Sequence, residues 1–215
     1  MKKNIFLLAA LSGMFLLASC GSGTESAEVT EATESTEETA VVEEAVEATY
    51  TVDAANSKIT WTGTAIGVYS HTGTINISEG SVTVSGGQLT GGSFTVDMSS
   101  IVPTKDATFN EENTPEKLVG HLNSADFFDI ENNPSATLAI KSVDGASATA
   151  DLTLRGKTGE VTVTDITVTT DVDGVSVTGS LTFNRQEYDV KWAYPEGDMV
   201  LSDDIELNFE ISANR

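Results

Sequence analysis

Residues 50–215 predict an all-β fold of about eight antiparallel strands. Three observations support this prediction. Apolar and polar residues alternate with a period of two in one run after another, glycine-containing turn sequences separate the runs, and only one segment carries helix signals. Strands joined by hairpins in this number form either a closed barrel or a sandwich of two sheets, and periodicity alone does not choose between them.

The alternating apolar residues mark the strands and the face of each strand that meets the core. In chain order they are Ile59 and Trp61; Ile75 and Ile77; Val82 and Val84; Phe94, Val96 and Met98; Leu138 and Ile140; Ala148, Ala150, Leu152 and Leu154; Val161 and Val163; Val175, Val177, Leu181 and Phe183; and Ile205, Leu207, Phe209 and Ile211. Ile166 and Val168 shift parity relative to Val163. We therefore expect a β-bulge near Thr164-Asp165.

Four dipeptides between these runs predict hairpin turns. Asp144-Gly145 and Asp173-Gly174 are strong signals for two-residue type I′ turns, whose central residues need positive φ. Gly86-Gly87 and Glu79-Gly80 are weaker versions of the same signal.

The connection 99–134 is too long for a simple hairpin loop, and it contains the one helix signal. Thr114 has the character of an N-cap, Pro115 suits the first helical position, and Glu116 places an acid in the first turn. Leu118 and Leu122 give this short helix an apolar face. Such an insertion caps a barrel end or forms a lid.

The N-terminus has the layout of an export signal. Lys2 and Lys3 precede an apolar run from Ile5 to Leu17, which is too short for a membrane span of about 20 residues. The run ends in Leu17-Ala18-Ser19-Cys20, which resembles a bacterial lipobox, and this Cys is the one cysteine of the chain. We therefore expect residues 1–19 to be a lipoprotein signal peptide and Cys20 to carry acyl chains, with a secreted protein and an incidental Cys as the alternative.

Residues 20–49 read as a lipidated Cys followed by a disordered acidic tether. After Cys20 this stretch contains nine Glu and has no Lys, Arg or aromatic residue, so it cannot bury enough apolar surface to fold. The simpler interpretation is a solvated spacer, and a second one is an export or partner signal. Acyl anchoring and Gly21 predict a cell-envelope location, at the outer membrane and facing either the periplasm or the outside.

Composition excludes several classes of function. The formal net charge is −22, and 50–215 alone has 24 acidic and nine basic residues, which argues against a nucleic-acid partner. One Cys and two His rule out a disulfide framework and leave little for a metal site. No nucleophile motif accompanies the histidines. We therefore expect no catalytic residues, no metal and no cofactor.

Several segments resemble one known family. The sequence HLNSADFFDI at 121–130, followed by Asn133-Pro134, resembles the signature of the YceI-like family. Further segments also resemble its patterns, namely DLTLRGKT at 151–158, FNRQEY at 183–188 and LSDDIEL at 201–207, so that the resemblance spans residues 50–214. It implies a lipocalin-like antiparallel eight-stranded barrel at 50–215, with a short helical insertion in the 99–134 connection. It also implies a lumen that binds an amphiphile, typically a polyisoprenoid, and no established enzymatic activity.

The inward faces of the predicted strands supply the candidate ligand-lining residues. Small residues on these faces leave volume for a ligand, although a dry packed core is the alternative. The candidates are Trp61, Phe94, Leu152, Leu154, Val175, Val177, Leu181, Phe183, Leu207 and Phe209. Candidate head-group contacts are His121, which could instead satisfy loop hydrogen bonds, and Arg185, which could instead form an ion pair with Glu187 or Asp189.

These observations predict a lipid-anchored envelope protein that holds or shuttles a polyisoprenoid or an isoprenoid-quinone-like amphiphile. Its expected partners are that hydrophobic ligand and the membrane, and a homodimer is compatible with the sequence. The alternative is a ligand-free structural or interaction β-domain displayed on an acidic stalk.

Overall fold

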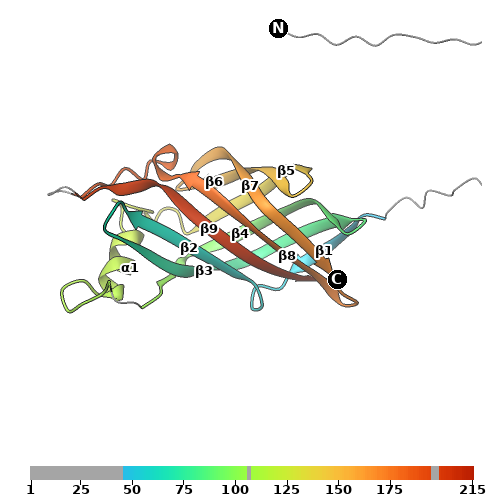
Figure 1. Cartoon of the computed structure of the whole chain (residues 1–215), viewed down its shortest axis with the longest axis horizontal. Helices are drawn as coiled ribbons and strands as arrows, with labels where there is room; N and C mark the ends of the chain where they lie inside the picture. The colour runs from blue at the N-terminus through green and yellow to red at the C-terminus, as the bar shows by residue number, and fades with distance from the viewer. Residues whose placement is uncertain (1–45, 106–107, 195–198) are drawn as a thin grey trace, which may run out of the picture. The chain divides into compact units, whose positions relative to one another are not determined.

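The computed structural model describes residues 46–105, 108–194 and 199–215 (Figure 1). The predicted signal peptide, Cys20 and nearly all of the acidic tether lie outside these residues. The described elements are β1 Ala48–Val52, β2 Lys58–Ala65, β3 Tyr69–Ser85, β4 Gln88–Pro103, α1 Pro115–Asn123, β5 Ser135–Asp144, β6 Ser147–Leu154, β7 Lys157–Thr170, β8 Gly174–Asn184, the 3₁₀ helix η1 Arg185–Tyr188 and β9 Leu201–Asn214.

The strands form one antiparallel sheet that closes on itself. Its order is β1-β3-β2-β9-β8-β7-β6-β5-β4, and pairing of β3 with β4 closes the ring. β1 pairs with residues 81–84 of β3 and β2 pairs with residues 69–75 of the same strand, so the two short strands share one position in the barrel. The result is a closed eight-position antiparallel barrel with one short α-helix, which confirms the predicted fold class.

Strand β3 corrects one predicted turn. Glu79-Gly80 lies inside this 17-residue strand, where the register against β4 shifts between Ile77 and Glu79. The shift moves the apolar side chains from odd to even positions, so Ile77 and Val82 both face the core. A Cβ on Gly80 would lie 2.8 Å from the Ser93 carbonyl oxygen, which shows that this glycine permits close approach of two strands and forms no turn.

The other turns agree with the sequence in part. Gly86 and Gly87 both have positive φ and form the expected two-residue connection between β3 and β4. The turn after Asp144 consists of residues 145 and 146, with positive φ at Gly145 alone. The prediction at Asp173-Gly174 was wrong, because residues 171–173 form a longer connection and Gly174 already belongs to β8.

Two local predictions are confirmed. The register of β7 against β8 shifts between Thr164 and Thr167, and Asp165 has a φ of 56°, as expected for a bulge at this point. The side chain of Thr114 accepts a hydrogen bond from the Lys117 N–H and caps α1. The connection that carries α1 is shorter than predicted, because β4 continues to Pro103.

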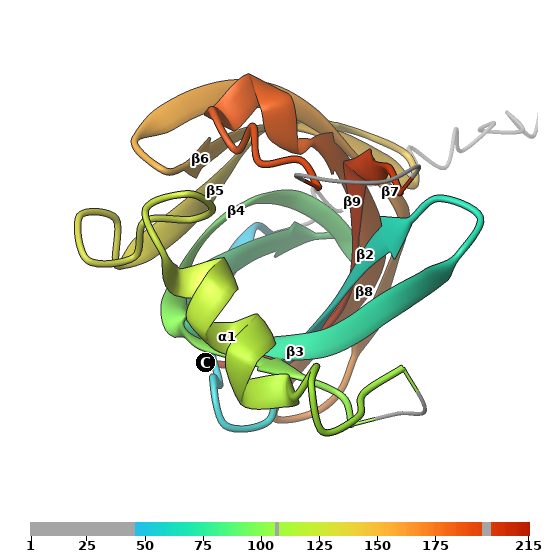
Figure 2. The ribbon, with the colours of Figure 1, turned by 90° about the vertical axis from the view of Figure 1, so that its left-hand side faces the viewer.

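The two ends of the barrel differ. α1 and the segment that follows η1 lie along the rim of one end, which faces the viewer in Figure 2. We call the half of the interior next to this rim the open half and the other the closed half. Closed-half side chains pack tightly, and among them are Tyr50, Val52, Val82, Val84, Val175, Val177, Ile211 and Ala213.

Candidate functional site

An apolar cavity of about 320 Å³ occupies the open half of the barrel. All strands from β2 to β9 except β7 contribute residues to its wall, and so does α1. The residues that line it are Ile59, Trp61, Gly63, Ala65, Tyr69, His71, Ile75, Val96, Met98, Ile101, Asn113, Lys117, Leu118, His121, Leu122, Phe127, Phe128, Ala136, Leu152, Leu154, Phe183, Trp192, Tyr194, Leu201, Ile205 and Leu207. The volume lies within the range of small-molecule sites, and the wall is predominantly apolar.

Some of the sequence-predicted lining residues lie in this wall, and some do not. Trp61, Leu152, Leu154, Phe183 and Leu207 line the cavity. The strands that carry them also place a second set of inward residues in the closed half, beyond the end of the cavity. Alternation identifies the inward face of a strand, but it does not say how far along the barrel a residue lies.

The remaining candidates are core residues of other regions. Val175, Val177 and Leu181 are buried in the core and do not contribute to the cavity wall. The Phe209 ring lies over Gly179, where an added Cβ would come within 2.5 Å of it. Phe94 packs beside Gly80 and Gly92. None of these five touches the cavity, so we remove them from the set of expected ligand contacts.

His121 on α1 places an unpaired polar atom in an apolar wall. Its ring makes edge contacts with Trp192, at 4.5 Å between centroids, and with Phe127, at 5.3 Å. Its Nε2 atom is buried and has no hydrogen-bond partner among the described residues. Burial lowers the pKa of His121 below its usual value, and Asp126 opposes this only in part. Burial therefore favours the neutral form of the imidazole.

A second polar group, formed by Tyr69 at the start of β3 and Tyr194 in the segment after η1, lines the cavity. The hydroxyls of Tyr69 and Tyr194 are 2.9 Å apart, and His71 packs against Tyr69 and stacks on Phe109. Burial, together with the hydrogen bond between the two hydroxyls, raises the pKa of Tyr194, so its hydroxyl stays protonated. Neither Tyr69 nor Tyr194 was predicted from the sequence as a cavity residue. For Tyr69, the alternation Tyr69-Ser70-His71 was an available signal.

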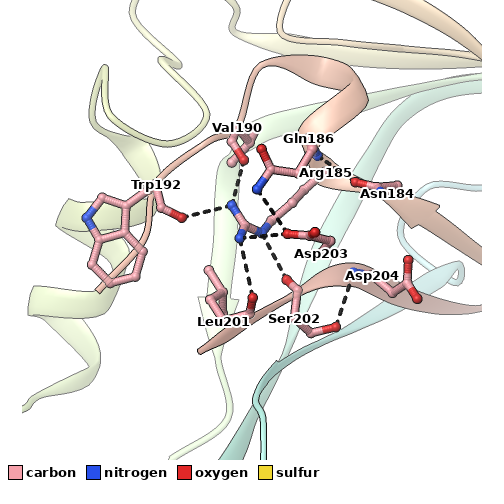
Figure 3. A network of polar contacts seen from close by, with 9 residues as sticks. All are labelled: Asn184, Arg185, Gln186, Val190, Trp192, Leu201, Ser202, Asp203 and Asp204. Carbon is pink, nitrogen blue, oxygen red and sulfur yellow. Dashed lines mark hydrogen bonds and ion pairs between the residues drawn. The ribbon is translucent and has the colours of Figure 1, made fainter. Parts of the chain in front are cut away.

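Arg185 does not face the cavity. It is 2% exposed, and its guanidinium donates to the carbonyl oxygens of Val190, Trp192, Ser202 and Leu201 and to the Asp203 carboxylate (Figure 3). Burial lowers its pKa, which Asp203 partly offsets. Arg185 therefore forms a structural ion pair and is not placed to contact a head group. Its partner is Asp203, and not Glu187 or Asp189 as the sequence suggested. By holding the Trp192 carbonyl, Arg185 positions a wall residue of the cavity.

Other kinds of site find no support in the parts of the chain that the structure describes. Within 46–105, 108–194 and 199–215 there is no group of three or more His, Cys, Asp or Glu side chains that could hold a metal ion. None of the helices in these same ranges has the length and apolar character needed to cross a membrane.

A closed antiparallel barrel with an apolar cavity at one end defines the lipocalin-like class of β-barrels. The model of the YceI-like domain matches residues 50–213, and the chain belongs to this family. It is 32% identical over 124 residues to a UPF0312 protein of Staphylococcus aureus strain USA300, covering 54% of this chain and 68% of that protein. A UPF0312 protein of Staphylococcus epidermidis is 31% identical over 124 residues, which again cover 54% of this chain and 68% of that protein.

Two solved structures have a similar fold. Burkholderia cenocepacia BcnA matches with a TM-score of 0.57 and 21% identity, covering 76% of this chain and 99% of that one. A polyisoprenoid binding domain from Saccharophagus degradans matches with a TM-score of 0.50 and 14% identity, covering 77% and 97%.

Proposed function

We propose that this protein holds or shuttles a hydrophobic amphiphile, a polyisoprenoid or an isoprenoid-quinone-like molecule, inside the barrel. The apolar cavity of about 320 Å³ is the observation that carries the proposal. An empty apolar cavity of this size costs free energy, because its lining loses packing contacts that a bound chain would restore. The structurally similar Saccharophagus degradans domain is described as polyisoprenoid-binding, which supports the same class of ligand here.

The uncharged polar groups of the wall, His121 and the Tyr69–Tyr194 pair, favour a neutral head group. Lys117, which also lines the cavity, donates a hydrogen bond from its Nζ to the Glu112 carbonyl oxygen. A ligand chain would lie against Trp61, Leu152 and Leu154, and its head would exchange a hydrogen bond with Nε2 of His121. The Tyr69–Tyr194 hydroxyl pair supplies a second donor and acceptor. Binding of this kind needs no bond to be made or broken, and we propose a binding protein with no enzymatic activity.

Organic extraction of the purified full chain, paired with native mass spectrometry, tests this proposal. We expect a bound lipid-like mass in the wild-type protein and its loss in Leu154→Asp, which sets a carboxylate against the apolar chain. Thr153→Trp is the matched control, because Thr153 lies on the outer face, where its hydroxyl bonds that of Thr158. Circular dichroism establishes that both variants fold. A wild-type protein without any extractable lipid, and without uptake of an added prenyl lipid, would leave a structural β-domain as the function.

We also propose that acylation of Cys20 anchors the protein at the outer membrane, with the acidic residues 21–49 as its tether. The proposal rests on the lipobox-like sequence and on the nine Glu of the tether. Cys20→Ala should prevent acylation and release the protein from the membrane fraction, as detergent partitioning would report. Limited proteolysis should cut within 21–47, since Ala48 and Thr49 belong to β1, and leave a resistant core. An unchanged membrane fraction for Cys20→Ala would contradict the anchor.

A further inference from the structure

We infer that the open rim of the barrel docks on a neutral lipid bilayer through the tip of the β2–β3 hairpin, an inference that rests on the proposed lipid-binding function. Two exposed aliphatic residues of this hairpin and one neighbour form what we call the apolar tip: Ile66 is 58% exposed, Val68 60%, and Val200, just before β9, 57%. They lie together, because the Ile66 N–H donates to the Val200 carbonyl at 2.8 Å and Val68 is two residues further along the turn. Aliphatic residues grouped in this way mark an interaction surface.

The charge around the tip selects a bilayer without net charge. Residues 59–70 contain no acidic or basic side chain, although residues 50–215 hold 24 acidic and nine basic ones. A partner protein with a basic surface would find no carboxylate within residues 59–70 of the hairpin to bind, and anionic lipids would be repelled by the acidic remainder of the domain. Insertion of a few aliphatic side chains into zwitterionic lipid needs no charge complementarity.

The tip adjoins the cavity. Ala65 and Tyr69, which flank the turn, both line the cavity wall. Tyr194, hydrogen-bonded to Tyr69, and Trp192, whose ring is 4.8 Å from that of Tyr194, continue the wall behind the tip. Tyrosine and tryptophan side chains prefer the depth of a bilayer at which lipid meets water. A bilayer in contact with the tip would let a hydrophobic ligand move between membrane and cavity without crossing water.

The chain outside the described barrel is long enough for this orientation. β1 begins at Ala48, which pairs with Val84 near the end of β3 opposite to the tip. The 26 residue steps from Cys20 to Val46 span at most about 90 Å. A 17-residue strand such as β3 rises about 55 Å. An anchor at Cys20 therefore leaves the open rim free to reach the same membrane, even though the chain leaves the barrel at the closed half.

Site-specific fluorescence measures the docking. The full mature chain carries Ile66→Cys or Val172→Cys, each labelled with an environment-sensitive fluorophore, in phosphatidylcholine vesicles that contain brominated lipid. Val172 is the matched control, because it is 90% exposed and belongs to the connection at the closed half. The unsubstituted chain, treated with the same reagent, gives the background from Cys20. We expect strong quenching at position 66 and little at 172. Equal quenching at both positions, or none at 66, would overturn the inference.

A transfer assay separates this inference from the proposed function. The Ile66→Ser/Val68→Ser variant should move a fluorescent prenyl lipid between phosphatidylcholine vesicles about tenfold more slowly, because the apolar surface that partitions into lipid is lost. Its extractable lipid should stay unchanged, and Val172→Ser should transfer at the wild-type rate. Transfer by Ile66→Ser/Val68→Ser at the wild-type rate would overturn docking but not lipid binding. Absence of extractable lipid from the wild-type protein would overturn both. If labels at position 66 quench one another without vesicles, a second copy covers the tip and the inference is wrong.

Discussion

The closed and open halves of the barrel are built from the same strands but are held together differently. In the closed half, Val175 and Val177 of β8 pair with Ala213 and Ile211 of β9, and all four side chains are buried. In the open half, Phe183 on the same strand faces the cavity. One sheet thus surrounds a packed closed half and a hollow open half, and different residues of the same strands form the two.

The rim of the open half is held by hydrogen bonds, an ion pair and ring contacts. Arg185 ties the segment at 190–192 to the start of β9 through hydrogen bonds to backbone carbonyls and an ion pair with Asp203 (Figure 3). Tyr188, buried at the end of η1, packs edge-on against Phe183 at 5.6 Å between ring centroids. Polar contacts to the backbone therefore add to ring packing at the rim of the open half, whereas the closed half is held by apolar contacts.

The largest expected effect comes from breaking the rim. Arg185→Ala leaves several buried carbonyl groups without a donor, and we expect it to lower the free energy of unfolding by about 3 kcal/mol. Urea denaturation followed by circular dichroism measures this. Arg185→Lys should recover only part of the loss, because one ammonium group cannot reach acceptors on both sides of the guanidinium fork. A loss below about 1 kcal/mol for Arg185→Ala would show that the rim does not depend on this residue.

A pair of tryptophan substitutions compares the two halves directly. Val177→Trp overpacks the closed half and should destabilise the protein by about 1–3 kcal/mol. Leu152→Trp adds its ring at the cavity wall, where space exists, and should cost less while reducing the amount of extractable lipid. Thermal unfolding and lipid extraction of both variants give the comparison. If Val177→Trp were tolerated and Leu152→Trp were the more destabilising change, the assignment of hollow and packed halves would be reversed.

The pH dependence of stability should report the burial of His121 beside the cavity of the open half. Because burial lowers the pKa of His121 below its usual 6.5, the folded state binds fewer protons than the unfolded state just below that pH. The contribution of His121 is complete above pH 6.5 and is lost as the pH falls toward its folded-state pKa. His121→Gln should therefore show a smaller loss of stability between pH 7.5 and 5 than the wild type. Identical pH profiles would show that His121 is solvated in the folded protein.

The smallest effect is expected at the exposed side of the rim. Lys157 and Lys191 hydrogen-bond the Asp189 carboxylate and hold its pKa at about 2, below the usual 3.8. This contribution is present above pH 3.8 and is lost as the pH falls toward 2. Since the groups are exposed, Asp189→Asn should shift the urea midpoint at pH 7 only slightly, and 1 M salt should remove the difference. A shift as large as that of Arg185→Ala would contradict this.

Alternation in the sequence located most of the strands and their inward residues, although it did not reveal β1 and it divided β3 at Gly80. A period of two follows directly from the pleat of a strand, so residues such as Leu152 and Leu154 were correctly assigned to the interior. The helix at 115–123 followed from an N-cap and a proline, and the bulge at Asp165 from a change of parity, because all these signals lie within a few neighbouring residues.

Which inward residues surround the cavity depends on the assembled barrel. Val177 and Leu154 have the same local pattern, yet one packs in the closed half and the other lines the cavity. Their difference depends on how far along the barrel each residue lies, which is set by the register of every strand around the ring. The same holds for Arg185, whose partners at 201–203 lie beside it only when β8 and β9 pair. Local sequence cannot determine such positions, because they result from contacts between residues distant in the chain.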